Sequence, residues 1–398
     1  MNRKISVGIA ISLVFITAAI TMILTWYLSQ QNFNSKITDL KERAEKYSQF
    51  ESFDTIVRSN FNGTIDETAL LDAIFNGYVD GLDDRYARYY TAEEYQTRQL
   101  EDSGTLFGIG VTVQKDESGY IRVTEVKTDS PAELSGIEAG DLIIAVDGND
   151  VVQTGYEESL NAVTAGEEGS QTELTINRGG DEISITVTRK MMEITSVSGQ
   201  MINENIAYIK IDSFNEKTST QFSQVLYTLL NNGAERIIFD VRNNGGGLVS
   251  AVEEVLEDIL PKGEVAFATY NDGEKVPIVT MENDNMIELP MVVLMNESTA
   301  SGGELFAQSL RDLCNVDLVG TTTYGKGVMQ TTYELESGGA VTITVATYQT
   351  TKSDCYDGIG IAPDFEVVLS EEAESYINGV DIENDFQLAK AIEVVTTG

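Results

Sequence analysis

The sequence predicts a layered α/β domain that carries an inserted β-rich module and follows an amino-terminal membrane helix. Three observations predict this organisation. After residue 200, strand-like runs alternate with helical stretches through connecting loops, which is typical of α/β layers. Between residues 104 and 190, short alternating strands are separated by turn residues. Near the start, residues 5–28 form one uncharged, mostly apolar run.

The apolar run at residues 5–28 is long enough to cross a membrane. A helix rises about 1.5 Å per residue, so a run of this length spans a bilayer core. Arg3 and Lys4 precede it, and Trp26 lies at its far end, where interfacial aromatic residues are expected. We therefore expect residues 1–30 to form an uncleaved, single-pass anchor with the amino terminus inside and the remainder outside the cytoplasm. A cleaved signal peptide is the alternative.

Residues 31–100 are expected to form a helical stalk and the amino-terminal part of the α/β domain. Apolar residues recur there at spacings of three and four, as on one seam of an amphipathic helix: Ile37, Leu40, Ala44 and Tyr47. This seam could pair two copies of the chain in a homodimer. A stalk helix that rests on its own domain explains the pattern equally well.

The composition excludes several classes of function. A net charge of −38 would repel a nucleic-acid backbone, so nucleic acid is not an expected partner. The chain has no histidine, which removes the Ser-His-Asp triad and the usual zinc and non-haem iron sites. We expect no cofactor and no metal. Cys314 and Cys355 are too few for a disulfide scaffold; a single bridge and two separate thiols both remain open.

The stretch NESTASGGE (296–304) places Ser301 where a buried strand is predicted to turn into a helix. Unpaired N–H groups at a helix amino terminus favour a developing negative charge, which suits a nucleophile. Gly302 and the next glycine leave the backbone open to a substrate. In the alternative interpretation, Ser301, Thr299 or Ser298 only caps the helix.

Without histidine, the proton acceptor for such a serine has to be a carboxylate or a lysine. A buried lysine loses its preference for the charged form and can act as a base. Lys326 lies between two glycines in TTTYGKGVMQ (321–330), an unusual setting for a solvated charge, although most lysines are surface residues. Gln330 could orient the amine through a hydrogen bond, or it is an ordinary amide on a strand surface.

A third motif, RNNGGGL (242–248), connects a predicted strand to a predicted helix. Backbone N–H groups in such a loop can bind a phosphate or an oxyanion. The loop lacks the lysine and hydroxyl residues of a nucleotide-binding loop, and acidic residues follow it, which disfavours phosphate. A flexible turn explains the glycines equally well.

The ordered motifs RNNGGGL, NESTASGGE and YGKGVMQ resemble those of the carboxyl-terminal processing peptidases, also called tail-specific proteases. The resemblance runs from about residue 50 to the end and includes GLDDRYARYY (81–90), GIGIAPD (358–364) and DFQLAKAIE (385–393). It implies a crotonase-like α/β serine–lysine peptidase domain at residues 191–398 with a PDZ domain inserted at residues 101–190.

The resemblance also implies roles for individual residues. Ser301 and Lys326 would form a catalytic dyad, with Gln330 beside the lysine. The backbone N–H groups of Gly302 and Gly246 would form the oxyanion hole. The PDZ domain would bind a peptide as an added strand and capture its terminal carboxylate, using these residues: Phe107, Gly108, Ile109, Gly110, Leu160 and Val163. Such a module could instead act only as a lid.

Three positions depart from the family pattern. This chain has Thr299-Ala300-Ser301-Gly302-Gly303-Glu304 where the family commonly reads S-A-S-A-S-E, and Gly245 and Arg85 stand where proline is frequent. None of these changes removes a reacting group. The resemblance therefore implies a membrane-anchored serine endopeptidase that cleaves extracytoplasmic proteins or peptides recognised by their carboxyl ends. The alternative is a catalytically silent PDZ scaffold that binds carboxyl-terminal peptides at the membrane.

Overall fold

The structure is a computed structural model of the 398-residue chain. It describes the following residues: 17, 21–22, 24–25, 44–164, 166–283, 286–370, 373, 377 and 380–397. The chain divides into two compact units, Met1–Leu71 and Asp72–Gly398.

The first unit contains a helix at residues 44–60 and the start of α2, Glu67–Asp80. Most of the predicted anchor at residues 5–28 lies outside the described residues, as do Ile37 and Leu40 of the predicted seam. Among the residues that are described, no helix has the length and apolar character needed to cross a membrane.

In the second unit, a six-stranded sheet forms the centre of the α/β domain. All its neighbours pair in parallel except β10, which is antiparallel to β11. The strands, in spatial order, are β10 (Val197–Met201), β11 (Ile206–Ile211), β12 (Arg236–Asp240), β15 (Met291–Met295), β16 (Asp317–Gly320) and β19 (Phe365–Glu366). The sequence predicted this repeated strand–loop–helix order.

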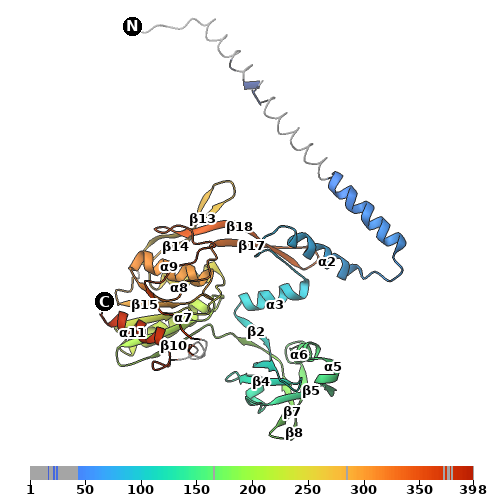
Figure 1. Ribbon diagram of the computed structural model, residues 1–398, viewed down its shortest axis with the longest axis horizontal. Coiled ribbons are helices and arrows are strands. Elements are labelled where there is room, and N and C mark those ends of the chain that lie inside the picture. The colour runs from blue at the N-terminus through green and yellow to red at the C-terminus, as the bar shows by residue number, and fades with distance from the viewer. Residues whose placement is uncertain are drawn as a thin grey trace. The chain divides into compact units, whose positions relative to one another are not determined.

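Helices cover both faces of this sheet, and Figure 1 shows them around β15. They are α7 (Thr218–Asn231), α8 (Val249–Glu257), α9 (Gly302–Cys314) and α11 (Phe386–Thr397). Successive residues of a strand point to opposite faces. Ile237 and Phe239 accordingly join the core that contains residues of α7, α8 and α9, whereas Ile238 joins the core that contains residues of α11.

A second sheet of the same domain contains β18, the strand that packs beside α9. It contains β1 (Arg88–Tyr90), β18 (Ala340–Thr350), β13 (Gly263–Tyr270), β14 (Lys275–Met281) and β17 (Val328–Glu334), with β17 paired to β18. β18 and β13 contribute buried residues to the same core as α9. This packing places β18 beside the helix that begins at Ser301.

The β-rich module has a hydrophobic core of its own. Its main sheet has the order β3 (Val111–Lys115), β4 (Ile121–Val126), β5 (Leu142–Val146), β7 (Gln171–Arg178) and β8 (Asp181–Thr188), with the short β6 (Asn149–Asp150) paired to β5. Its helices are α4 (Pro131–Leu134), α5 (Val151–Thr154) and α6 (Tyr156–Thr164). The chain arrives through α3 (Ala92–Asp102), and the entering and leaving segments pair as β2 (Thr105–Gly108) and β9 (Lys190–Glu193).

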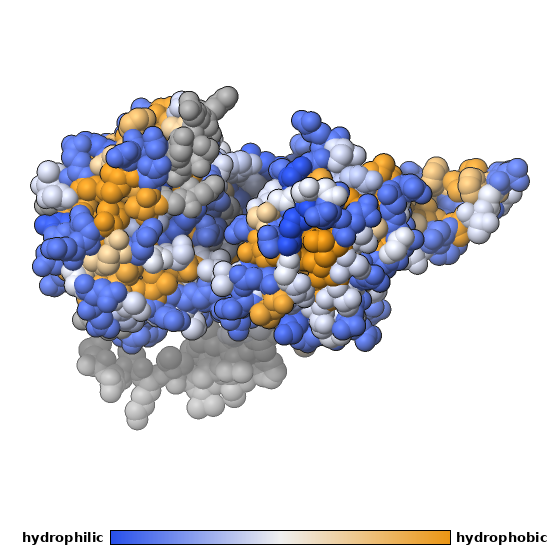
Figure 2. Space-filling view, turned by 90° about the horizontal axis from the view of Figure 1, so that it is seen from below, coloured by the Kyte–Doolittle hydropathy of each residue, from blue (hydrophilic) through white to orange (hydrophobic). Residues whose placement is uncertain are grey.

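On the face drawn in Figure 2, hydrophilic side chains surround several apolar patches. The chain has 64 acidic and only 26 basic residues, so a local group of cations is unusual on this protein.

Candidate active site

Ser301 lies where the sequence predicted it, between a buried strand and a helix. Every residue of β15 is buried, and α9 begins at Gly302 directly after the serine. The backbone of Ser301 has φ 52° and ψ −113°, a conformation that a residue with a side chain rarely adopts. Strain of this kind persists only where the surroundings enforce it, and it is concentrated at functional sites.

The carboxylate of Glu304 enforces that position. Glu304 is completely buried and accepts the N–H of Ser301 at 2.9 Å and the N–H of Lys326 at 2.8 Å, both on Oε2. Its other oxygen accepts the N–H of Gly325 at 2.7 Å and the hydroxyl of Thr323 at 2.5 Å. One side chain thus fixes the serine loop to the lysine loop. Our sequence reasoning missed this role, although serine followed three residues later by glutamate is a capping-box signal.

Lys326 lies in the loop that follows β16, and its amine is 4.8 Å from the ring centre of Tyr86. Burial lowers the pKa of Lys326, and the positive charges of Arg98 and Arg85 lower it further. The carboxylates of Glu304 and Asp84 oppose this shift without reversing it. The amine therefore gives up its proton more readily than an ordinary lysine, as a general base requires.

The serine hydroxyl and the lysine amine are not engaged with each other. Within the described part of the chain, no hydrogen bond joins the side chains of Ser301 and Lys326. Instead, the hydroxyl of Tyr348 on β18 donates to the Lys326 carbonyl at 2.9 Å and contacts the Ser301 side chain. Burial raises the pKa of Tyr348, so this hydroxyl stays neutral.

The structure does not show the Gln330 amide bound to the Lys326 amine, so its orienting role stays a prediction. Its side-chain nitrogen donates to the Val328 carbonyl at 3.3 Å and to the Thr344 hydroxyl at 3.2 Å. A β-bulge lies between Met329 and Gln330, where β17 pairs with β18. The strand and its bulge turn the amide toward β18, so a four-residue spacing in sequence does not become a contact with Lys326.

The two glycines predicted for the oxyanion hole lie together. A Cβ atom on Gly246, whose φ is 101°, would stand 2.8 Å from the backbone nitrogen of Gly302 and from Cβ of Ser301. Only glycine fits there. The N–H of Gly302 is at the first position of its helix, where no preceding turn supplies an acceptor. The N–H of Gly246, however, donates to Oδ1 of Asn244 at 2.8 Å, so this predicted donor is already occupied.

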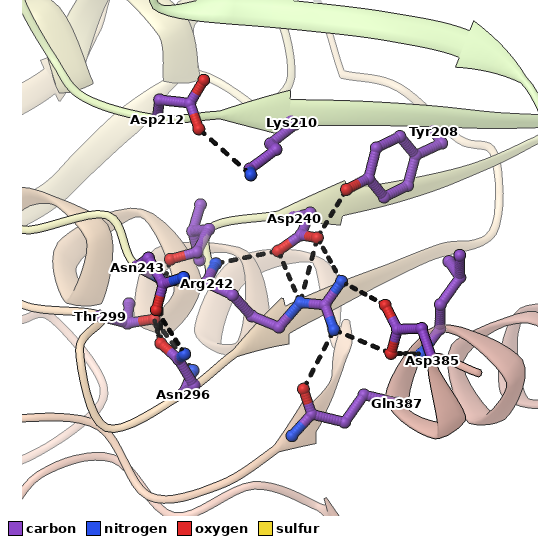
Figure 3. A network of polar contacts seen from close by, with 12 residues as sticks. Tyr208, Lys210, Asp212, Asp240, Arg242, Asn243, Asn296, Thr299, Asp385 and Gln387 are labelled. Carbon is purple, nitrogen blue, oxygen red and sulfur yellow. Dashed lines mark hydrogen bonds and ion pairs between the residues drawn. The ribbon is translucent and has the colours of Figure 1, made fainter. Parts of the chain in front are cut away.

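A polar network holds the glycine loop against the serine loop (Figure 3). The N–H of Asn243 donates to Oδ1 of Asn296 at 2.9 Å, and Nδ2 of Asn296 donates back to Oδ1 of Asn243 at 2.8 Å. Ala300 adds a bond from its N–H to the Asn244 carbonyl at 2.9 Å. Both candidate oxyanion donors therefore belong to one cross-linked unit.

At the base of this loop, the buried guanidinium of Arg242 binds two buried carboxylates (Figure 3). Its NH2 group lies 2.6 Å from Asp240 and 2.8 Å from Asp385, and its NH1 group donates to Gln387 at 3.1 Å. Tyr208 donates its hydroxyl to Asp240 at 2.7 Å. The motif DFQLAKAIE thus has a structural role, because it fixes α11 to the start of the glycine loop.

The residues predicted to capture a peptide in the β-rich module divide into three groups. Ile109 and Val163 are each 2% exposed and belong to the core, so their side chains do not line an open pocket. Phe107 and Gly108 pair with β9. Gly110, with φ 84°, and Leu160 on α6 are packed against the module as well.

One strand of the module is nevertheless placed to receive a peptide. β3 lies at the end of its sheet, and its only partner there is β4. Lys115 at the end of β3 lies 5.8 Å from the ring centre of Tyr156 at the start of α6. The outer edge of an end strand offers backbone groups to an added strand.

Cys314 and Cys355 are free thiols, which settles the question that the sequence left open. Burial raises the pKa of Cys314, so this thiol is not activated. Within the described residues, no group of three or more acidic or cysteine side chains is arranged to hold a metal ion.

Comparisons with known proteins identify the family of this chain. The profile of peptidase family S41 matches residues 205–367, and that of the PDZ domain matches residues 107–188. The carboxy-terminal processing protease CtpA of Bacillus subtilis is 30% identical over 91% of this chain and 78% of its own length. The chain belongs to peptidase family S41. The relatives that it matches are carboxyl-terminal processing proteases. This S41 protease is a serine endopeptidase of that type.

One further relative supports the assignment, and one solved structure shares the fold. A carboxyl-terminal-processing protease of Picosynechococcus is 33% identical to this S41 protease over 79% of the chain and 76% of its own length. A solved structure described as an S41 protease of Bacteroides fragilis covers 86% of this chain and 96% of its own, with a TM-score of 0.54 and 16% identity. The second match concerns the fold alone.

Proposed function

We propose that this S41 protease cleaves peptide bonds with a Ser301–Lys326 dyad. The observation that carries the proposal is the Glu304 carboxylate, which binds the backbone N–H of both residues and so holds two distant loops at one place. The depressed pKa of Lys326 and the strained backbone of Ser301 are the properties that a base and a nucleophile need. Family membership favours this enzyme over the silent scaffold.

In the proposed reaction, the neutral amine of Lys326 takes the proton of the Ser301 hydroxyl. Ser301 Oγ then attacks the substrate carbonyl and forms a tetrahedral oxyanion, which the N–H of Gly302 stabilises. The intermediate expels the amine half of the substrate, which takes the proton from Lys326, and leaves an acyl-enzyme. Lys326 then activates a water molecule that hydrolyses the ester. The N–H of Gly246 joins the oxyanion hole after Asn244 releases it.

A serine-directed probe tests the assignment. We expect a fluorophosphonate to label wild type at Ser301, with mass spectrometry identifying the modified peptide. Labelling should be lost in Ser301→Ala and reduced at least about a hundredfold in Lys326→Ala, because the hydroxyl then lacks its base. Ser298→Ala is the matched control, since Ser298 is exposed on the same loop. Labelling at Ser298, or equal labelling of the lysine variant, would contradict the proposal.

The β-rich module is proposed to recognise the carboxyl end of the substrate and to gate the site. Two observations support this role: the free edge of β3, and the β2–β9 ribbon through which the chain enters and leaves the module. The separated serine and lysine would be the resting arrangement. Capture of a peptide would then move the amine from Tyr86 to Ser301.

Binding to the Ser301→Ala variant tests the recognition step. A fluorescent peptide with a free, apolar carboxyl end should bind at least about tenfold more tightly than the same peptide with an amidated end, because backbone N–H groups hold the carboxylate. Fluorescence anisotropy measures both affinities. Equal affinity of the two peptides would show that the module does not read the terminal carboxylate.

Membrane anchoring through residues 5–28, an extracytoplasmic catalytic domain and a homodimer also remain proposals. The anchor rests on the uncharged apolar run and its flanking charges. The dimer rests on the helix at residues 44–60, where several large apolar side chains are 47–67% exposed: Tyr47, Phe50, Phe53 and Ile56. Apolar side chains of this kind on one helix are typical of a protein contact, either with a second copy or with the chain's own domain.

A further inference from the structure

Two arginines lie near the proposed dyad in a chain that is otherwise strongly acidic. The charges of Arg98 and Arg85 both act on Lys326. Arg98 is already paired, because its guanidinium lies 2.8 Å from Asp102. Arg85 differs from the other arginines of the described ranges in that its guanidinium contacts neither a carboxylate nor a backbone carbonyl. Arg85 is exposed, so its guanidinium is accessible to an incoming ligand.

Aromatic rings fix Arg85 close to the catalytic loops. Its guanidinium carbon lies 4.6 Å from the ring centre of Tyr86 and 5.6 Å from that of Tyr324. The amine of Lys326 lies over the same Tyr86 ring, 4.8 Å from its centre. Tyr324 donates its N–H to the carbonyl of Thr299 at 3.0 Å, two residues before the nucleophile. Stacking of this kind orients the planar guanidinium and leaves its N–H groups free to bind an anion.

A second group at the same place also lacks an acceptor. The hydroxyl of Tyr86 is buried and donates no hydrogen bond within the described residues, and the nearby Arg85 guanidinium can only donate to it. The carboxylates nearest to these groups have other partners: Asp84 accepts the backbone N–H of Tyr86 and of Thr344, and Asp357 accepts the N–H of Gly327. A buried donor without a partner costs free energy that an incoming acceptor would recover.

We propose that Arg85 and the Tyr86 hydroxyl form a carboxylate-binding subsite next to the Ser301–Lys326 dyad, which selects substrates that place a carboxylate there. The carboxylate comes from an aspartate or glutamate side chain near the cleaved bond or from the substrate's own terminus. This subsite rests on the proposed function, since it orients a substrate for that dyad.

A set of matched peptides tests the subsite. The parent peptide is uncharged and amidated at its carboxyl end, which keeps the PDZ domain from contributing through a terminal carboxylate. Single Gln→Glu exchanges around the cleaved bond supply a side-chain carboxylate, and a short parent peptide with a free end supplies a terminal one. We expect wild type to favour one glutamate peptide or the free-end peptide by about tenfold in kcat/KM, and Arg85→Gln to abolish that ratio.

Three further variants separate binding from an effect on the fold. Arg85→Glu should reverse the preference toward a lysine-containing peptide, and Tyr86→Phe should lower the preference while keeping the ring. Arg88→Gln is the matched control, because Arg88 is also exposed and also lies over a tyrosine, Tyr90, at 4.8 Å. The preference of Arg88→Gln should equal that of wild type.

Affinities measured with the Ser301→Ala background keep this test independent of the dyad. If wild type cleaves none of the peptides, the proposed function fails, while anisotropy still reports whether Arg85→Gln loses the carboxylate preference in binding. The subsite is refuted if wild type shows no preference in either readout. It is also refuted if Arg85→Gln weakens parent and glutamate peptides equally, or if Arg88→Gln has the same effect as Arg85→Gln.

Discussion

Replacing Lys326 by alanine is expected to lower kcat/KM by about 10³- to 10⁴-fold, the contribution typical of a lost general base. Lys326→Arg should be equally inactive. Arginine keeps the positive charge but does not release its proton in proteins, so this variant separates charge from basicity. Initial rates on an unstructured peptide measure both effects.

Two comparisons make the lysine result specific. Lys275→Ala is the matched control, because the Lys275 amine also lies over an aromatic ring, at 4.6 Å from the centre of Phe267, but on another strand. Its activity should match wild type. Ser301→Ala combined with Lys326→Ala should be no slower than either single variant, since the two residues act as one unit. If the double variant instead loses activity by the product of the two single losses, Ser301 and Lys326 do not act as one unit.

Asp385→Ala is expected to lower the free energy of unfolding by about 3–5 kcal/mol. The change removes one of the two carboxylates that bind the fully buried guanidinium of Arg242 and leaves part of its charge uncompensated. Asp385→Asn should cost less, because an amide oxygen still accepts a hydrogen bond. Urea unfolding measures the change, and the loss of the α11 attachment should also reduce activity through the glycine loop.

A partly exposed pair on the same helix provides the control for this network. Lys390, which is half-buried and 5.0 Å from the ring centre of Phe365, lies 2.8 Å from the exposed Glu393 on α11. Solvent-screened pairs contribute about 0–1 kcal/mol, so Lys390→Ala should cost much less stability than Asp385→Ala. If Asp385→Ala costs no more than Lys390→Ala, the buried network does not fix α11 to the rest of the domain.

The parts of the site that local sequence determines were predictable. The position of Ser301 between a strand and a helix followed from local hydrophobic patterns, and the missing histidine directed attention to Lys326 as a candidate base. Glu304 could have been found in the same way, since its contact with Ser301 spans three residues. The strand–loop–helix order of the domain was also readable from hydrophobic patterns.

The parts that were missed depend on contacts between distant segments. Asp385 and Arg242 are separated by 143 residues, and no local pattern shows that they meet. Tyr348 reaches Lys326 only because β18 pairs beside the lysine loop. The contacts of Gln330 have the same origin, because a bulge and a partner strand determine where its amide points.

The pH dependence of Ser301 labelling tests most directly whether a neutral Lys326 is the base. Because its pKa is lowered, the neutral fraction of the amine rises with pH through a midpoint below the ordinary value of 10.5. The labelling rate should follow that rise in wild type and lose it in Lys326→Ala. A rate that is independent of pH, or that rises only at the ordinary lysine value, would contradict the account.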